Sequence, residues 1–177
     1  MKSLKSYIQE KRIIKKSNNN YKYFPKTKKE LKDIILQRIK EEGKEVDLND
    51  IDVSKITDMT SLFEGTDFNG NISEWNVSNV KNMSGMFWAC KSFNKDISNL
   101  DVSNVTDMSY MFAWCEAFNK DISSWDVSGV NNMGYMFYRC KIFNQDISVW
   151  DVSNVKKMNN IFIGCKIKEK YKPKFSV

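Results

Sequence analysis

Cysteines, carboxylates and aromatic side chains are the groups in this chain that could do chemistry, because the sequence contains no histidine. Its absence excludes imidazole acid–base catalysis, Ser-His-Asp triads and histidine-ligated metals. The cysteines recur at a single spacing and lack the Cys-x-x-Cys pattern of zinc and redox sites. This pattern favours buried thiols over a metal site or a disulfide ladder. The four residues are Cys90, Cys115, Cys140 and Cys165.

Aspartates also recur at one position, and we call them the acidic ladder. Its members are Asp52, Asp101, Asp126 and Asp151, with Asn76 in the same place of one unit. Like charges on neighbouring strands repel, so each carboxylate needs a compensating donor. In one interpretation, the serine two residues later bonds the carboxylate. A row of cation sites and a docking strip for a basic partner are the alternatives.

The spacing of these acids is explained by repetition better than by a paired acid–base site. The seven glycines form neither a G-x-G-x-x-G motif nor a P-loop, so no phosphate-binding loop is indicated. A second recurring series is interpreted as turn residues that bond their own backbone: Asn69, Asn94, Asn119 and Asn144. We therefore expect a protein that is not an enzyme and that holds no cofactor and no metal.

A repeated unit positions all of these residues. The units read FNGNISEWNVSNVKNMSGMFWAC, FNKDISNLDVSNVTDMSYMFAWC, FNKDISSWDVSGVNNMGYMFYRC and FNQDISVWDVSNVKKMNNIFIGC. The valine of the Asp/Asn-Val-Ser step recurs after 24, 25, 25 and 25 residues, at Val53, Val77, Val102, Val127 and Val152. A fixed period of this size predicts a solenoid, in which each unit buries its apolar face against its neighbours.

Each unit places apolar residues at nine positions, numbered from the isoleucine: 1, 4, 6, 9, 12, 15, 16, 19 and 22. In one unit these are Ile122, Trp125, Val127, Val130, Met133, Met136, Phe137, Cys140 and Phe143. Alternation across Trp-Asp-Val-Ser predicts a short strand, and the later spacing predicts about two turns of helix over residues 133–140. The fold class is therefore an α/β repeat, a leucine-rich-repeat-like solenoid of about five coils, each a short parallel strand plus a short helix.

The segment before the repeats predicts an N-terminal helical cap. Thr27 and Glu30 form a capping box, apolar residues keep helical spacing, and Gly43 stops the helix, which gives a helix over 28–42. A short amphipathic helix is also expected over residues 2–14. We divide the chain into an N-terminal segment and linker (1–20), a capping-helix region (21–46), the repeat solenoid (47–168) and a basic C-terminal tail (169–177).

Charge is unevenly distributed within the net value of +6. Residues 1–46 carry 14 Lys/Arg against 6 Asp/Glu, and residues 166–177 carry 5 against 1, whereas residues 47–165 carry 9 against 15. Solvated flanks explain the basic ends, and nucleic-acid binding through those termini is a competing interpretation. No apolar run is long enough for a membrane span.

The units, above all WDVSNV…MSxMFxxC…FNxDIS, closely resemble the BspA-like leucine-rich-repeat family, which includes the mycoplasma lipoprotein-associated repeat. The likeness covers residues 47–165. It implies a leucine-rich-repeat-like solenoid without catalysis, used for adhesion or other protein binding at bacterial surfaces. The chain departs from that pattern because it shows no secretory signal and no lipidation cysteine. We expect an intracellular protein as the sequence stands, and a surface-exposed one if a signal or anchor was removed.

The first ten residues, MKSLKSYIQE, resemble the head-targeting leader of internal capsid proteins of large tailed phages. That likeness implies cleavage after Glu10 and a phage-encoded or phage-packaged protein, located in the capsid, that binds and inhibits a host factor. Neither the identity of a partner nor the oligomeric state follows from the sequence.

Positions that vary between otherwise similar units point to the partner site, because the scaffold does not dictate them. Positions 14, 17 and 18 are expected to face outward and are rich in the residue types of interface hot spots. The hypothesised partner-binding residues are Trp88, Tyr110, Trp114, Tyr135, Tyr138 and Arg139. Stacking of these rings to fill gaps between neighbouring helices is the alternative. We predict a non-enzymatic, adhesin-like module that binds a protein partner.

Overall fold

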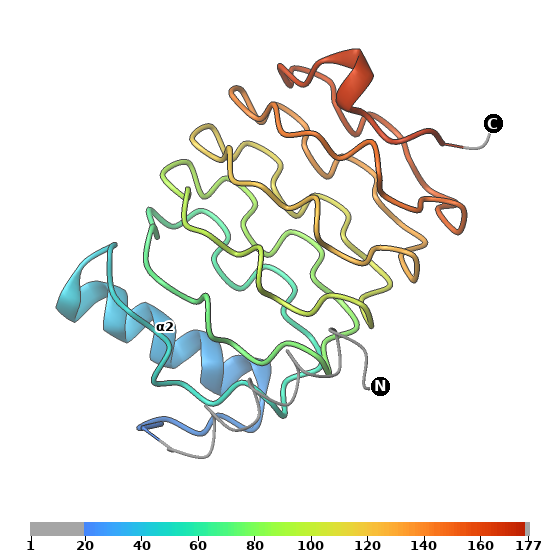
Figure 1. The fold of residues 1–177 in the computed structure, drawn as a ribbon. Helices are drawn as coiled ribbons and strands as arrows, with labels where there is room; N and C mark the ends of the chain where they lie inside the picture. Colours follow the sequence, from blue (N-terminus) through green and yellow to red (C-terminus); the bar gives the residue numbers. More distant parts are fainter. Residues whose placement is uncertain (1–19, 176–177) are drawn as a thin grey trace, which may run out of the picture.

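The computed structural model describes residues 20–175, a stack of irregular turns of chain with one helix at its N-terminal end (Figure 1). The helical elements in this range are α2 (Lys28–Glu42) and a 3-10 helix, η1 (Glu169–Tyr171). The helix predicted over 2–14 and the phage-like leader lie outside the described residues. Within residues 20–175, no helix is both long and apolar enough to cross a membrane.

The helix predicted over residues 28–42 is confirmed, together with both of its caps. The Thr27 hydroxyl oxygen accepts from the Glu30 N–H at 3.2 Å, and the Glu30 carboxylate accepts from the Lys26 N–H at 2.7 Å. These bonds satisfy donors that a helix N-terminus leaves without partners. Gly43 ends the helix with φ 87, a conformation that glycine adopts without steric cost.

α2 closes one end of the stack through apolar and ionic contacts. Leu31 and Ile35 are fully buried against the first turns of chain. Lys28 Nζ lies 2.7 Å from an Asp58 carboxylate oxygen and ties the start of the helix to the first turn. The helix thereby covers the apolar cross-section that the end of a stack would otherwise expose.

Each turn of chain, which we call a coil, pairs with the next through backbone hydrogen bonds spaced one repeat apart. The paired segments are 59–65, 83–89, 108–114, 133–139 and 158–164. Alternate N–H groups of one segment donate to carbonyls of the next, as from Met83 to Asp107 at 2.9 Å and from Phe87 to Met111 at 3.0 Å. Isolated parallel bridges lie at the start of these segments, at Asp58, Asn82, Asp107, Asn132 and Lys157.

The short strand predicted at the Trp-Asp-Val-Ser step does not form, because this step is a turn. The Asp126 carboxylate accepts from the Ser128 N–H at 3.1 Å and from its hydroxyl at 2.7 Å. The Val130 N–H then bonds the Val127 carbonyl at 2.9 Å. These local bonds occupy donors that a strand would offer to its neighbour.

The two turns of helix predicted over residues 133–140 do not form either. Tyr135 and Arg139 have φ values of 59 and 54, which a right-handed helix does not contain. Their N–H groups donate to the next coil, at Asn159 and Ile163. Overlapping four-residue turns take the place of the helix, as where the Cys140 N–H bonds the Phe137 carbonyl at 3.0 Å.

The nine predicted core positions are buried in the inner units, and all nine residues of the unit that begins at Ile122 are at most 4% exposed. The last unit departs from this, with Met158 37% exposed. Two files of phenylalanine rings run through the centre of the stack. The first file has centroids 5.3 to 5.8 Å apart, at Phe63, Phe87, Phe112, Phe137 and Phe162. The second has spacings of 5.8 to 6.0 Å, at Phe68, Phe93, Phe118 and Phe143. These contacts add stacking to the apolar burial.

Side chains bond the backbone of neighbouring coils as well. The prediction that the asparagine series bonds its own backbone is wrong. Each asparagine bonds the coil that follows, as where Asn69 Oδ1 accepts from the Asn94 N–H at 2.9 Å. The same bond recurs from Asn119 to Asn94 and from Asn144 to Asn119. The Trp125 indole N–H donates to the Ile97 carbonyl of the preceding coil at 3.1 Å.

The four cysteines are free thiols, and Cys90, Cys115 and Cys140 are fully buried. The Cys140 thiol contacts the Cys115 carbonyl of the preceding coil at 3.1 Å. Burial raises the pKa of Cys90 to about 11 and also raises the pKa of Cys115 and Cys140. Cys165 is half-buried. The thiols therefore pack as small apolar groups.

We expect iodoacetamide to modify Cys115 and Cys140 only in unfolded protein, because a neutral buried thiol is a poor nucleophile. An unfolded cysteine loses its proton near about pH 8.5. Native Cys90 keeps its proton until about pH 11. The free energy of unfolding should therefore fall as pH rises through this window. Mass spectrometry of labelled protein, with and without guanidinium, tests the labelling. Urea unfolding at pH values on both sides of the window tests the pH dependence. Labelling of Cys115 before Cys165 in the native protein would contradict the prediction.

Gly70 is required by a close approach between coils. A Cβ at this position would lie 1.9 Å from the Val46 carbonyl oxygen. We expect Gly70→Ala to lower the free energy of unfolding by about 1–3 kcal/mol or more, as overpacking does. Gly134 is the matched control, since its Cβ would come no closer than 3.4 Å to Asn132 Oδ1. Urea unfolding measures both variants, and equal losses would refute the steric argument.

Candidate functional site

The six hypothesised partner-binding residues form one continuous chain of contacts across three coils, which we call the aromatic ladder. The Tyr110 and Tyr135 rings stack with centroids 4.7 Å apart. Trp88 packs on Tyr110 at 5.8 Å. Tyr138 meets Tyr135 edge-on at 5.7 Å and Trp114 edge-on at 6.1 Å. The structure therefore brings all of these rings together.

Arg139 completes the ladder as its cationic member. Its guanidinium lies 4.6 Å from the centroid of the Trp114 ring and 5.6 Å from that of Tyr138. Its Nε also donates to the Tyr138 hydroxyl at 3.3 Å. Such cation–π contacts hold an arginine in place while it remains exposed.

Exposure differs along the ladder. Trp88 and Tyr110 are 40% and 38% exposed, whereas Trp114, Tyr135 and Tyr138 are half-buried. The prediction that repeat position 17 faces outward is wrong in one coil, because Ala113 is fully buried there. The buried methyl group leaves room for the larger rings of the neighbouring positions. The exposed part of the ladder is thus centred on Trp88 and Tyr110.

The backbone under the ladder is left-handed. Tyr110, Trp114, Tyr135 and Arg139 have φ values of 57, 62, 59 and 54. This conformation costs a residue with a side chain about 1–2 kcal/mol. Other coils are left-handed at the same two positions with residues that carry no aromatic ring: Ser61, Gly65, Gly85, Ala89, Asn160 and Gly164. The coil itself therefore does not require a large side chain there, and strain retained at such positions points to function.

A shallow groove of about 400 Å³ runs beside the two stacked tyrosines. Its lining is polar apart from the rings: Ser109, Tyr110, Asn132, Gly134, Tyr135, Lys157 and Asn159. The Tyr135 hydroxyl accepts from Asn160 Nδ2 at 2.9 Å. A ligand in this groove would meet an aromatic wall, a cation and amide groups.

The groove borders a row of polar side chains that sequence reasoning missed. We call it the central polar row: Asp58, Asn82, Asp107, Asn132 and Lys157. Neutral asparagines separate the carboxylates, and Asn132 Nδ2 donates to Asp107 Oδ2 at 2.9 Å. Burial opposes ionisation of Asp58, but hydrogen bonds from Lys28 and Thr60 lower its pKa overall. The signal in the sequence is the alternation of Asp and Asn at repeat position 11.

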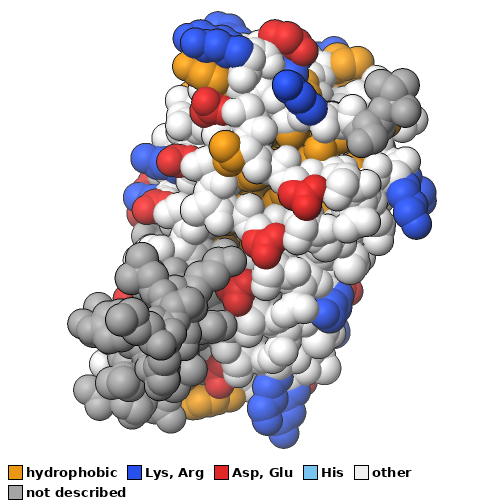
Figure 2. Space-filling view, turned by 45° about the vertical axis from the view of Figure 1, so that its right-hand side comes forward, with side chains coloured by type: hydrophobic (Ala, Val, Ile, Leu, Met, Phe, Trp, Pro, Cys, Tyr) orange, Lys and Arg blue, Asp and Glu red, His pale blue; other side chains and the backbone are white. Residues whose placement is uncertain are grey.

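The acidic ladder lies in turns, and the predicted bond from the serine two residues on is present. Asp101 accepts from the Ser103 N–H at 3.2 Å and from its hydroxyl at 2.6 Å. The same donation lowers the pKa of Asp151. Figure 2 shows acidic side chains in a file across the middle of one face. In the described part of the chain, no three such side chains are grouped to hold a metal ion.

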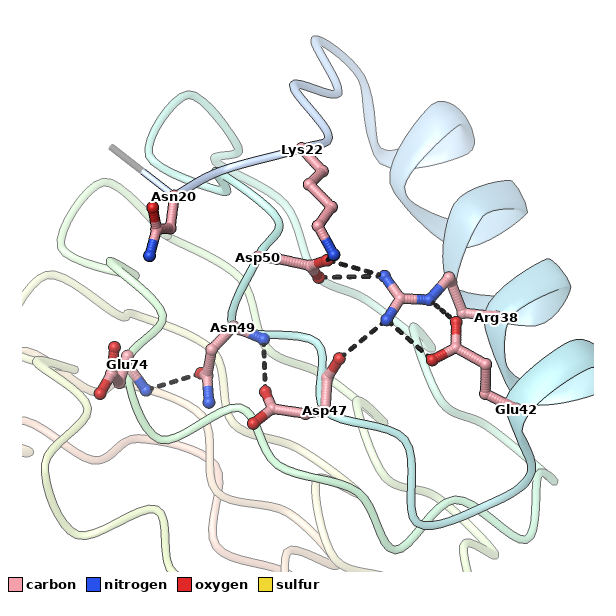
Figure 3. Close-up of a pocket in the computed structure, with 8 residues that line it drawn as sticks. All are labelled: Asn20, Lys22, Arg38, Glu42, Asp47, Asn49, Asp50 and Glu74. Carbon is pink, nitrogen blue, oxygen red and sulfur yellow. Dashed lines mark hydrogen bonds and ion pairs between the residues drawn. The ribbon is translucent and has the colours of Figure 1, made fainter. Parts of the chain in front are cut away.

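A second hollow, of about 340 Å³, lies between α2 and the first coil (Figure 3). The buried Arg38 guanidinium donates to Asp50 at 3.0 Å and to the Asp47 carbonyl at 3.1 Å, and it also pairs with Glu42. These contacts, the hydrogen bond to Glu42 first, raise the pKa of Arg38. We regard this cluster as the clamp that fixes α2. Helical spacing placed Arg38 on the helix beside Glu42, but its partners Asp47 and Asp50 come from another segment.

Comparison with known protein families finds a match to one family model. Residues 31–125 and residues 67–174 match the family described as "Mycoplasma protein of unknown function, DUF285". Comparison with curated proteins and with solved structures finds no match.

Tyr135 tests the left-handed backbone under the ladder. We expect Tyr135→Gly to have a free energy of unfolding about 1 kcal/mol higher than that of Tyr135→Ala, as measured by urea unfolding, because glycine alone adopts positive φ freely. Tyr138 is the control, since its φ is not positive. There the order should reverse, with Tyr138→Ala more stable than Tyr138→Gly. The same order at both sites would rule out strain at Tyr135.

Proposed function

The chain belongs to this family of mycoplasma proteins of unknown function, and we propose that it is a non-enzymatic module that binds another protein through the aromatic ladder. We propose further that its repeats are BspA-like leucine-rich-repeat coils, about five in number, in a solenoid capped by α2. The one-repeat register of backbone bonds between coils and the burial of the nine apolar positions support this architecture. An adhesin-like role is part of the same proposal.

The observation that carries the proposal is the combination of residue type and backbone strain in the ladder. Trp, Tyr and Arg dominate binding energy at protein interfaces because they bury large surfaces and still offer polar atoms. Tyr110 and Tyr135 hold their rings at left-handed positions where Gly85 serves another coil. Their mutual stacking orders the rings before a partner arrives, which lowers the entropy lost on binding.

The chemistry of the other polar groups supports binding over catalysis. The sequence has no histidine, and three of the four thiols are buried with raised pKa values. Carboxylates such as Asp101 and Asp126 bond serines in turns. Arg38 is held by the acids around α2. These carboxylates, the buried thiols and Arg38 are thus already engaged in the scaffold.

The proposal is tested with a triple variant, Trp88→Ala, Trp114→Ala and Tyr138→Ala. We expect capture of the partner from native host lysate to fall by at least about tenfold, because interface hot spots contribute about 2 kcal/mol or more each. The measurement is quantitative mass spectrometry of proteins retained on the immobilised chain, with thermal unfolding as a check of the fold.

The matched control is the double variant Ile142→Ala and Val149→Ala, which removes exposed apolar surface elsewhere in the coils. These side chains are 45% and 74% exposed. The control should retain the same partner as the unmodified chain. Equal retention by the folded triple variant would refute the ladder as the binding site, and equal loss in the control would show binding by general apolar contact.

A further inference from the structure

The last coil carries backbone donors that no other coil in the described part of the chain pairs. In the coil before it, alternate N–H groups donate to the last coil, as from Tyr135 to Asn159 at 2.8 Å and from Phe137 to Ile161 at 3.0 Å. The corresponding donors of the last coil have no acceptor among residues 20–175. They belong to Met158, Asn160, Phe162 and Gly164. We call residues 156–164 the C-terminal edge.

The C-terminal edge presents donors almost exclusively. Its carbonyls at Asn159, Ile161 and Ile163 already accept from the coil below. One carbonyl of the edge, that of Lys156, faces outward. We infer this from the coil below, where the Asn131 carbonyl at the same repeat position accepts from the Lys156 N–H. Two such edges cannot pair with each other, since donors would face donors. A partner must therefore bring a row of acceptors.

The surroundings of the edge are basic and partly apolar. Residues 156–174 contain seven lysines and one acidic residue, Glu169. Met158 and Ile163 are 37% and 52% exposed. Acceptors, negative charge and apolar side chains are thus all complementary to this surface. An extended polypeptide with acidic and apolar residues offers all three, whereas a nucleic acid offers no aliphatic side chains to cover Met158 and Ile163.

The rest of this end of the stack is covered by the chain itself. The Ile147 N–H donates to the Tyr171 carbonyl at 3.0 Å, and Ile167 is buried beneath the segment that carries η1. Figure 1 shows that segment crossing the last coil at the end opposite α2. Lys172 of that segment lies 5.6 Å from the centroid of the Phe162 ring, whereas Met158 and Ile163 of the C-terminal edge stay exposed.

A second copy of the chain does not fit the edge. The opposite end of the stack, which would supply the matching carbonyls, is covered by α2. The occupant that remains is a segment of a different protein.

We propose that the C-terminal edge binds an extended acidic segment of a partner protein. The segment supplies carbonyls to the four N–H groups that lack an acceptor within residues 20–175, as strand addition does at an open sheet edge. Its acidic side chains meet Lys156 and Lys166, which flank the row and are exposed. Its apolar side chains cover Met158 and Ile163. This site borders the end of the aromatic ladder, where Asn160 bonds the Tyr135 hydroxyl, but its four N–H groups are not part of the ladder.

The probe for this site is a synthetic peptide of alternating glutamate and valine, added to the full chain. Hydrogen exchange of the Met158, Asn160, Phe162 and Gly164 amides is followed by NMR. We expect exchange to slow by about tenfold or more at saturation, because each amide gains an acceptor. A peptide of alternating lysine and valine keeps the same backbone and apolar groups, and it should protect none of the four.

Charge reversal separates the edge from other basic surfaces. The double variant Lys156→Glu and Lys166→Glu should weaken binding of the glutamate peptide by about tenfold, because two exposed ion pairs are lost and their contributions to binding add. The control reverses two exposed lysines elsewhere, Lys55→Glu and Lys91→Glu, and should bind as the unmodified chain does. Thermal unfolding confirms that both variants are folded.

An oligothymidine probe supplies negative charge without a peptide backbone. Protection of the four amides by the glutamate peptide, with loss on reversal of Lys156 and Lys166, supports the proposal. Protection by oligothymidine but not by the peptide would overturn it in favour of nucleic-acid binding. Unchanged exchange with every probe would overturn it outright. The triple variant Trp88→Ala, Trp114→Ala and Tyr138→Ala keeps Tyr135 and Arg139, the ladder residues next to the edge, and should leave this assay unaffected. Failure here and failure of the ladder are therefore distinguishable.

Discussion

Backbone pairing across one repeat length is the interaction on which the rest of this structure depends. Within a coil, overlapping four-residue turns satisfy half of the peptide groups of segments such as 133–139, and the neighbouring coils satisfy the other half. A single coil therefore cannot complete its own hydrogen bonds. The phenylalanine files follow the same register, so apolar burial and backbone pairing become complete together. α2 is needed because the first coil has no preceding coil to cover its apolar side chains.

Sequence reasoning succeeded where the signal is local or recurs in every unit. Thr27, Glu30 and Gly43 fix the helix over Lys28–Glu42, because caps act within a few residues of the helix ends. Burial of the nine core positions could be predicted because each unit repeats the same apolar spacing. Six surface residues could be selected as candidate partner-binding residues because their repeat positions vary between units whose other positions are nearly constant. The stacking of Tyr110 on Tyr135 follows from the constant repeat length, which places equal positions side by side. The other ring contacts join different repeat positions and did not follow from it.

The local conformation of the coils could not be predicted, for a physical reason. The apolar spacing of residues 133–140 is the same in a helix and in a row of overlapping turns. Carbonyls of the next coil decide between the two, and they lie about one repeat away in sequence. The left-handed backbone at Tyr135 was hidden because only Gly85 marks that repeat position with glycine. Partners of Arg38 were hidden for the same reason of sequence distance.

The scaffold separates the residues that hold coils together from those that face outward. Phenylalanines, methionines and buried thiols repeat with little change, and the aromatic ladder varies above them. Because the ladder rests on backbone that is paired on both sides, its rings keep their positions without support from a helix or a strand. A surface of this kind can change its residues while the coils beneath keep theirs.

Alternation in the central polar row limits how the number of coils can change. Asn82 separates the carboxylates of Asp58 and Asp107, and Asn132 separates Asp107 from Lys157. Loss of the coil that holds Asn82 would set two carboxylates side by side at strand spacing, where like charges repel. Loss of the coil that holds Asp107 would join two neutral amides instead. Duplication or deletion of units in the gene is thus tolerated unequally, and arrays of this type should lengthen by copying asparagine-bearing units.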